Sequence, residues 1–148
     1  RGLIMLFENT LKQTHIWLAE ISEEIGDPDQ KLAYHALRGV LHALRDRLPV
    51  DEAAQFAAEL PMLVRGIYYE GYRSAGKPLR MREPEEIYER VQRELDMAGG
   101  GNAQTATRAV MKVLRHRMSE GELKDAQGTF PPHLQRLFPD LEQRPGQH

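Results

Sequence analysis

Residues 36–47 read ALRGVLHALRDR, and residues 106–117, seventy positions later, read ATRAVMKVLRHR. In both stretches small and aliphatic side chains recur every three or four residues, which is the spacing of one face of an α-helix. Six of the twelve positions are identical, and the apolar positions keep the same phase. The pair predicts two equivalent buried helices and, with no strand pattern elsewhere, an all-α fold.

The similarity extends outward from these two stretches. Residues 17–68 align without a gap with residues 87–138, and ten of the 52 pairs are identical. Pro61 and Pro131 coincide, each at the start of a short apolar segment, where proline favours a helix N-terminus. The period exceeds the 20 to 50 residues typical of solenoid repeats. We therefore predict one domain over residues 1–148, a pseudo-twofold bundle of two tandem copies of a roughly 70-residue four-helix unit. The copies are expected to pack through Trp17, Val40, Leu44, Ile87, Val110 and Leu114.

Local signals set the expected helix boundaries. An apolar stripe from Phe7 to Ile25, with alternating spacings of four and three residues, traces one face of a first helix. Asp27 is the expected cap of the next helix, and residues 119–122 (SEGE) have the spacing of a capping box. Gly99 to Gly101 predict a flexible loop, and residues 140–148 a disordered tail.

Composition excludes several classes of function. The net charge is −2, so the overall field favours neither nucleic acid nor an anionic membrane. The chain has no cysteine, which excludes disulfides and thiolate chemistry and agrees with a reducing, cytoplasmic location. The longest apolar run, residues 3–7, is far too short for a membrane span and lacks the features of a signal peptide.

Two motifs resemble a known family. LRDRLP at residues 44–49 and LPMLVRGIYYEGY at residues 60–72 are similar to the bacterial domain of unknown function 2267. The resemblance covers nearly the whole chain. It implies an α-helical, bacterial, cytoplasmic protein and carries no activity or catalytic residue.

No catalytic signature accompanies these helices. None of the six histidines belongs to a helical zinc motif, and none of the three serines lies in a nucleophile elbow. His42 and Asp46, one helical turn apart, offer two metal ligands without a visible third. We therefore predict no catalytic residue, no cofactor and no metal site, although an enzyme assembled from dispersed residues stays open.

Basic residues form the first candidate binding surface. Arg38, His42 and Arg45 share one helix face, and Arg108, Lys112 and Arg115 hold the corresponding positions of the second copy. Side by side, the two stripes would form a groove for phosphate, strengthened by histidine protonation on mild acidification. The alternatives are a merely solvated face and an architectural role, since arginines stabilise helix C-termini.

A tyrosine-rich segment is the second candidate. Tyr69, Tyr72 and Arg73 belong to a basic stretch, and aromatic rings interleaved with positive charge are typical of single-stranded nucleic acid binding. The alternative is that the tyrosines pack in the core. We expect Leu63 and Ile67 to be buried while Tyr69 or Tyr72 keeps an exposed ring.

The absence of visible chemistry favours a non-enzymatic interaction module that binds an unidentified protein or a second copy of itself, with no membrane partner. The alternative is a nucleic-acid or polyanion binder that uses the basic stripes and the tyrosine-rich segment.

Overall fold

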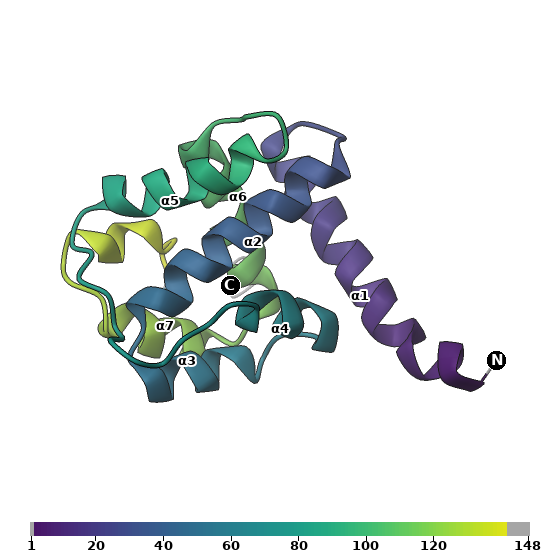
Figure 1. Cartoon of the computed structure of the whole chain (residues 1–148), viewed down its shortest axis with the longest axis horizontal. Coiled ribbons are helices and arrows are strands. Elements are labelled where there is room, and N and C mark those ends of the chain that lie inside the picture. Colours follow the sequence, from purple (N-terminus) through teal and green to yellow (C-terminus); the bar gives the residue numbers. More distant parts are fainter. Residues whose placement is uncertain (1, 142–148) are drawn as a thin grey trace, which may run out of the picture.

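The structure, a computed structural model, is entirely helical in the part of the chain that it describes, residues 2–141 with side chains from residue 5 (Figure 1). The elements are α1 (Gly2–Ile25), α2 (Gln30–Arg47), α3 (Val50–Ala57), α4 (Met62–Tyr69), α5 (Pro84–Asp96), α6 (Ala103–Arg117), α7 (Glu120–Gly128) and the 3₁₀ helix η1 (Leu134–Leu137). The all-α prediction is confirmed. The final short helix differs from expectation, because Pro131 is followed by a 3₁₀ turn and not by an α-helix.

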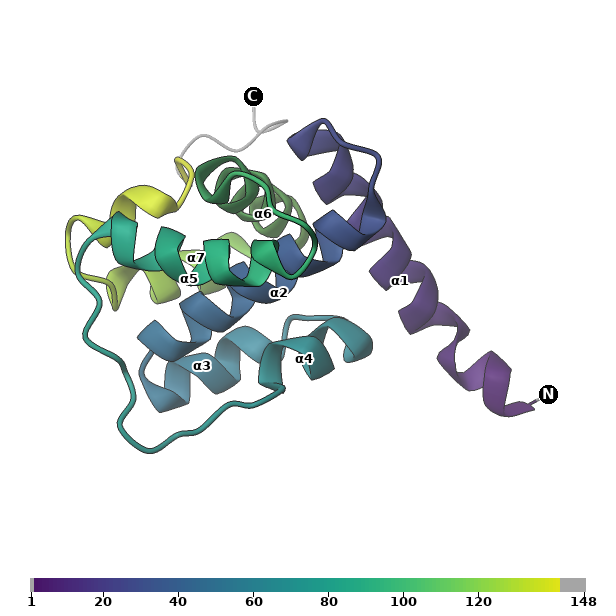
Figure 2. The ribbon, with the colours of Figure 1, turned by 45° about the horizontal axis from the view of Figure 1, so that its top comes forward.

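The two central helices, α2 and α6, occupy the core. Each is flanked by α1 and α5, which also contact the shorter elements at their ends (Figure 2). The apolar residues of α2 and α6 are buried almost without exception, as the quoted stretches predicted. Six residues expected to join the halves are all at most 2% exposed: Trp17, Val40, Leu44, Ile87, Val110 and Leu114.

The shorter elements close the ends of the bundle. Helices α3 and α7 pack against each other, α4 packs on α1 and α2, and η1 contacts α5 and α6. Between α2 and α5 the backbones approach closely at Gly39, where an added Cβ would lie 3.1 Å from the Cβ of Glu94. Glycine at this position therefore permits the close approach of α2 and α5.

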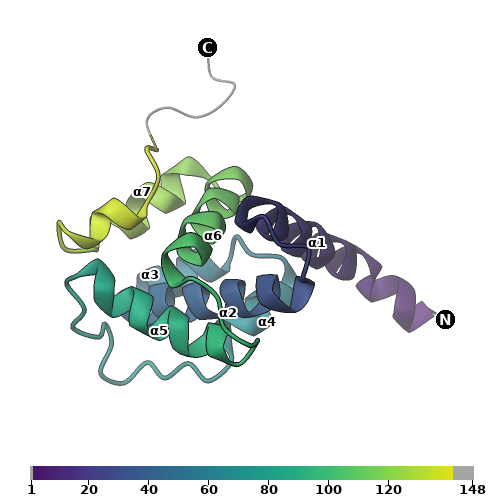
Figure 3. The same cartoon turned by 90° about the horizontal axis from the view of Figure 1, so that it is seen from above.

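The apolar stripe of α1 is buried only toward the C-terminal end of the helix. Thr14 and Trp17 are buried, but Phe7 and Leu11, on the same helix face, are 45% and 54% exposed. Figure 3 shows the reason: the N-terminal part of α1 extends beyond the other helices. The stripe is correctly helical, but only its second half has a partner within the chain.

Local boundary signals were mostly correct. Asp29, not Asp27, is the N-cap of α2, and its carboxylate accepts a hydrogen bond from the Lys31 N–H at 2.9 Å. Gly99, Gly100 and Gly101 all have positive φ values, so the α5–α6 connection needs glycine as predicted. The predicted tail at 140–148 lies outside the described residues except for Asp140 and Leu141, and the Leu141 side chain is buried.

Within residues 2–141 no helix combines the length and the apolar character needed to cross a membrane.

Candidate functional site

The basic stripe of α2 lies against acidic partners from other elements. The Nδ1 atom of His35 is 2.6 Å from Oε2 of Glu94, a residue of α5. Arg38 forms an ion pair with Glu70 at 3.0 Å and lies 3.9 Å from the same Glu94 carboxylate. This face of α2 is therefore a polar seam between packed elements and not a freely solvated surface.

Arg45 is the most deeply buried member of the stripe, at 5% exposure. Its Nη1 atom donates hydrogen bonds to the carbonyl oxygens of Tyr68 at 2.5 Å and Glu70 at 2.7 Å, and its Nε atom bonds Asp46 at 3.1 Å. These carbonyls end α4, so Arg45 caps the C-terminus of a neighbouring helix. The architectural interpretation of this arginine fits its contacts, although the helix it stabilises is not its own.

His42 is committed to the same joint. Its Nε2 atom donates a hydrogen bond to the carbonyl oxygen of Ile67 at 2.8 Å. Burial lowers the pKa of His42 despite this bond, and the nearby charges of Arg45 and Arg38 lower it further. Asp46, its expected companion, accepts a hydrogen bond from Arg90 at 2.6 Å. The predicted strengthening of phosphate binding at mildly acidic pH requires protonation of this ring, which its surroundings disfavour.

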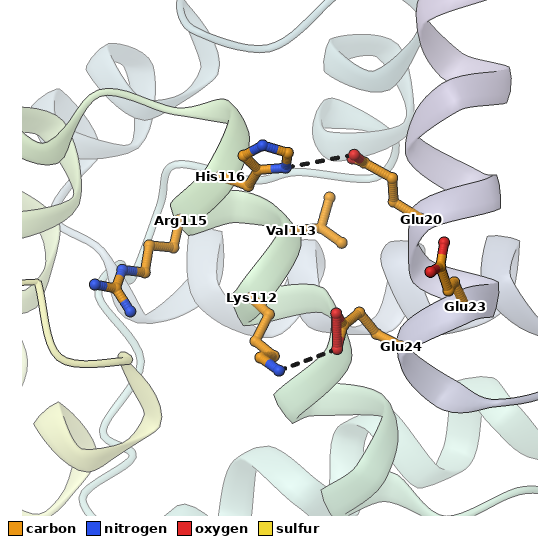
Figure 4. Close-up of a pocket in the computed structure, with 7 residues that line it drawn as sticks. All are labelled: Glu20, Glu23, Glu24, Lys112, Val113, Arg115 and His116. Carbon is orange, nitrogen blue, oxygen red and sulfur yellow. Dashed lines mark hydrogen bonds and ion pairs between the residues drawn. The ribbon is translucent and has the colours of Figure 1, made fainter. Parts of the chain in front are cut away.

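The equivalent stripe on α6 is more open. Lys112 reaches Glu24 of α1 at 3.1 Å, and both side chains are more than a third exposed. Together with Arg115 they line a surface hollow of about 470 Å³ between α1 and α6, where Figure 4 shows Lys112 pointing to Glu24 across the hollow. Arg108 is exposed and lines a second hollow, with Phe138.

The hollow between α1 and α6 has a lining of mixed charge. It contains three glutamates from α1 and a lysine, an arginine and a histidine from α6. The Arg117 guanidinium lowers the pKa of Glu20 through two hydrogen bonds of 2.8 and 2.7 Å, and His116 lies 3.4 Å away. Because acidic and basic side chains are mixed in this lining, it favours neither an anionic nor a cationic ligand.

The structure does not bring the two stripes together. The α2 stripe faces α4, α5 and the segment that follows α4, whereas the α6 stripe faces α1 and η1. The twofold groove suggested by the sequence would need both stripes on one surface.

The tyrosine-rich segment divides between core and surface. Tyr68 is fully buried, stacks on Phe56 with 5.6 Å between ring centroids, and donates its hydroxyl to the carbonyl of Ala53 at 2.8 Å. Tyr69 is 38% exposed, which confirms the prediction of an exposed ring. Tyr72 is half-buried, with the cations of Arg45 and Lys77 within 6 Å of its ring.

The expected burial of Leu63 is wrong. Leu63 is 41% exposed and Ile67 is only half-buried. Helix α4 packs instead through Val64 and Tyr68. Each of these follows one of the two expected residues by one position, so Leu63 and Ile67 are turned away from the core.

Arg73 belongs to a long irregular segment, residues 70–83, between α4 and α5. Two further contacts with the end of α2, in addition to those of Arg45, hold this segment. The Leu79 N–H donates to the Asp46 carbonyl at 2.8 Å, and the Arg47 Nε donates to the Met81 carbonyl at 2.8 Å. Arg73, Arg80 and Arg82 are exposed along it. Loops of this length are uncommon and are often functional.

Sequence reasoning missed a group of three carboxylates. Glu52 of α3 and Glu122 and Asp125 of α7 each place one oxygen within 4.8 Å of the other two. Burial, and then the adjacent Glu52, raise the pKa of Glu122 to about 8. The signal was present, because Glu52 and Glu122 are an identical pair in the internal alignment, but their contact depends on how α3 meets α7.

It also missed an exposed apolar surface at the start of the chain. Four residues of α1 and two of α4 form this apolar surface: Met5, Leu6, Phe7, Leu11, Met62 and Leu63, each between 41% and 71% exposed. The Leu63 N–H donates to Oγ1 of Thr10 at 2.9 Å, which fixes the start of α4 beside the middle of α1. The sequence pattern gave both segments the character of buried elements.

Comparison with known proteins agrees with the resemblance noted in the sequence. No curated protein matches the chain. A family model described as an uncharacterized conserved protein (DUF2267) matches residues 14–137, which include every helix from α2 onward and the second half of α1. The chain therefore belongs to the DUF2267 family.

Proposed function

We propose that this protein is a non-enzymatic interaction module that self-associates through the apolar surface of α1 and α4. The single observation that carries the proposal is the exposure of Phe7 and Leu11 on a helix that projects from the bundle (Figure 3). Soluble domains rarely leave a contiguous set of large apolar side chains in water unless the set meets a partner.

A second copy of the chain is the occupant that the pattern favours. Phe7, Leu11, Thr14, Leu18 and Ile21 alternate at four and three residues, the spacing of a helix that packs along another helix. The inner part of the stripe packs within its own chain, and the outer part continues in the same phase. An interface made from one patch on each copy is isologous, the geometry of most homodimers.

The charges on this part of α1 permit such a pairing. Among residues 5–13 the only charged side chains are Glu8 and Lys12, which have opposite signs. Two copies of the segment therefore carry no net repulsion at neutral pH. Met62 and Leu63 widen the patch on the side of α4, which gives the projecting helix a broader contact than a single stripe would.

Sedimentation equilibrium tests the proposal. Wild type should form a dimer at micromolar concentration, and Leu6→Glu with Leu11→Glu should be monomeric with unchanged helix content, because both side chains are exposed in the monomer. Met97→Glu is the matched control: Met97 is 69% exposed but lies at the end of α5, away from the surface. A wild type that stays monomeric at all concentrations contradicts the proposal.

We also propose that the fold is a pseudo-twofold arrangement of two tandem copies. Helices α2 and α6 end at Arg47 and Arg117, and α3 and α7 begin at Val50 and Glu120, an offset of 70 in each case. Each half contributes to the packing of the other, since α1 contacts α6 as well as α2, and α5 contacts α2 as well as α6. The identical pair Glu24 and Glu94 follows this pattern, since Glu24 contacts α6 and Glu94 contacts α2.

The proposed setting is the bacterial cytoplasm. Support comes from the family resemblance and from a chain without cysteine, which needs no oxidising compartment to fold.

Binding of single-stranded nucleic acid is a second candidate, favoured by the segment at residues 70–83. Arg73 and Arg80 are exposed and form no ion pair with any residue between 2 and 141, and the exposed ring of Tyr69 precedes them. Fluorescence polarisation with a labelled oligonucleotide at low salt should detect binding that Arg73→Ala with Arg80→Ala weakens. Arg108→Ala, on the exposed α6 stripe, is the control. It should leave binding unchanged if residues 70–83 supply the affinity, and weaken binding if the stripe does.

A further inference from the structure

Three carboxylates meet where α3 contacts α7. Glu52 lies in the first turn of α3, Glu122 lies in the first turn of α7, and Asp125 follows one turn later. Glu122 is 8% exposed, Glu52 is half-buried and Asp125 is exposed. The group therefore extends from the core to the surface, and its outer member gives access from solvent.

The two inner carboxylates lack partners for part of their charge. The Oε2 atoms of both Glu52 and Glu122 are buried and have no hydrogen-bond partner. Within the described chain, no lysine or arginine forms an ion pair with either residue or with Asp125. The groups that act on Glu122 are Glu52, Asp125 and Glu59, all acidic, and the phenol of Tyr68 lies close to it. Buried carboxylates of like charge require either a proton or a cation between them.

The capping of α7 explains why Glu122 is available. A glutamate at the third helical position ordinarily reaches back to the N–H of the capping residue and closes a capping box. Here the Ser119 N–H donates to Oε1 of Glu59 at 2.7 Å, and the Ser119 hydroxyl donates to Oε2 of Glu59 at 2.6 Å. Ser119 still caps α7 through the Glu122 N–H at 3.1 Å, but the Glu122 carboxylate is released. The expected box is thus only half formed.

We propose that Glu52, Glu122 and Asp125 bind one hard divalent cation, of the class of Ca²⁺, Mn²⁺ or Mg²⁺. All three donors are carboxylate oxygens, which such ions prefer, and no sulfur or imidazole belongs to the group. Opposite ligands of one ion lie two bond lengths apart, about 4.0 to 5.2 Å for these metals. The three oxygens all lie within 4.8 Å of one another, so none is too far from the others to share one ion. Water completes the coordination on the exposed side of Asp125.

The site would join the two halves of the chain. Glu52 belongs to the first half, and Glu122 and Asp125 to the second, so a bound cation would hold α3 against α7. Such a cation would also neutralise the like charges of the two buried carboxylates.

Isothermal titration calorimetry of the full chain with MnCl₂ and with CaCl₂ tests the proposal. Wild type should bind one ion per chain. Glu122→Gln keeps the size of the side chain but removes its charge, and should weaken binding at least about tenfold. Asp125→Asn should do the same from an exposed position where no folding defect is expected. Asp51→Asn, an exposed acid in the same turn of α3, is the control and should bind like wild type.

Thermal unfolding provides an independent readout. Because the cation would hold α3 against α7, MnCl₂ should raise the Tm of wild type and not that of Glu122→Gln. If wild type binds neither Mn²⁺ nor Ca²⁺ at millimolar concentration, the proposal is overturned. If wild type, Glu122→Gln and Asp125→Asn bind the ion equally well, the ion binds to other surface carboxylates, and the proposal is overturned as well.

Discussion

The two central helices carry the same arginines in different surroundings. Arg45 of α2 is 5% exposed and ends α4 through two carbonyls, whereas its counterpart on α6, Arg115, is only half-buried and lines an open hollow. The first half has a complete α4 followed by residues 70–83, which cover the end of α2. The second half ends in the four-residue η1. Identical residues at equivalent positions therefore do not imply equivalent environments.

Separating the halves should have the largest effect. Because α1 packs on α6 and α5 packs on α2, each half exposes an apolar helix face when alone. We expect fragments 1–74 and 75–148 to show little helix individually by circular dichroism and to regain it when mixed. A fragment that unfolds cooperatively on its own would show that one half can form a core without the other.

Substitution of the paired arginines should separate the two environments next. Arg45→Met leaves the Tyr68 and Glu70 carbonyls without their donor and should lower the free energy of unfolding by about 3 kcal/mol. Arg115→Met should cost about 1 kcal/mol or less, since its surroundings are more open. Urea denaturation of both variants measures the difference. Equal losses would remove the contrast between α2 and α6.

The pH dependence of stability provides a third comparison. The pKa of His42 is lower in the folded chain than in the unfolded chain, so acid protonates this side chain more readily in the unfolded state. The free energy of unfolding therefore falls as the pH drops below about 6.5. His42→Gln, which retains a donor to the Ile67 carbonyl, should lose part of this acid sensitivity. Urea midpoints at several pH values measure it. Lys112→Gln, the same change at the aligned position of α6, is the control and should keep the acid sensitivity of wild type.

The smallest effect is expected at the exposed ion pair of the second stripe. Lys112 and Glu24 are 59% and 37% exposed, so solvent screens their attraction. Lys112→Ala should change the free energy of unfolding by about 0.5 kcal/mol or less. A loss comparable with that of Arg45→Met in the same denaturation assay would mean that the α6 stripe is as structural as the α2 stripe.

Periodicity and capping chemistry were sufficient for most of the fold. The apolar spacing around Val40 and Val110 predicted two buried helices, and Ser119 caps α7 within the segment predicted to form a capping box. These features depend on residues within a few turns of each other. The phase of α4 was misjudged, because Leu63 and Val64 are both apolar and only the neighbouring helices decide which one is buried.

The candidate sites were harder to predict, because they depend on contacts between distant residues. A helix wheel places Arg45 on a basic stripe, but its partners are carbonyls 23 and 25 residues away. The contact between Glu52 and Glu122 spans seventy residues, and the alignment recorded their identity without their proximity. The exposed part of α1 has the pattern of a buried helix, since an apolar stripe is the same whether its partner is intramolecular or a second copy.

The central claim, that the projecting part of α1 pairs with α1 of a second copy, can be tested by one distance measurement. The chain lacks cysteine, so Asn9→Cys places a single spin label on the exposed start of α1. Pulsed electron paramagnetic resonance should show a short, well-defined distance between labels on two chains, which Leu6→Glu with Leu11→Glu abolishes. A featureless background at the same protein concentration, unchanged by that double substitution, would contradict the account.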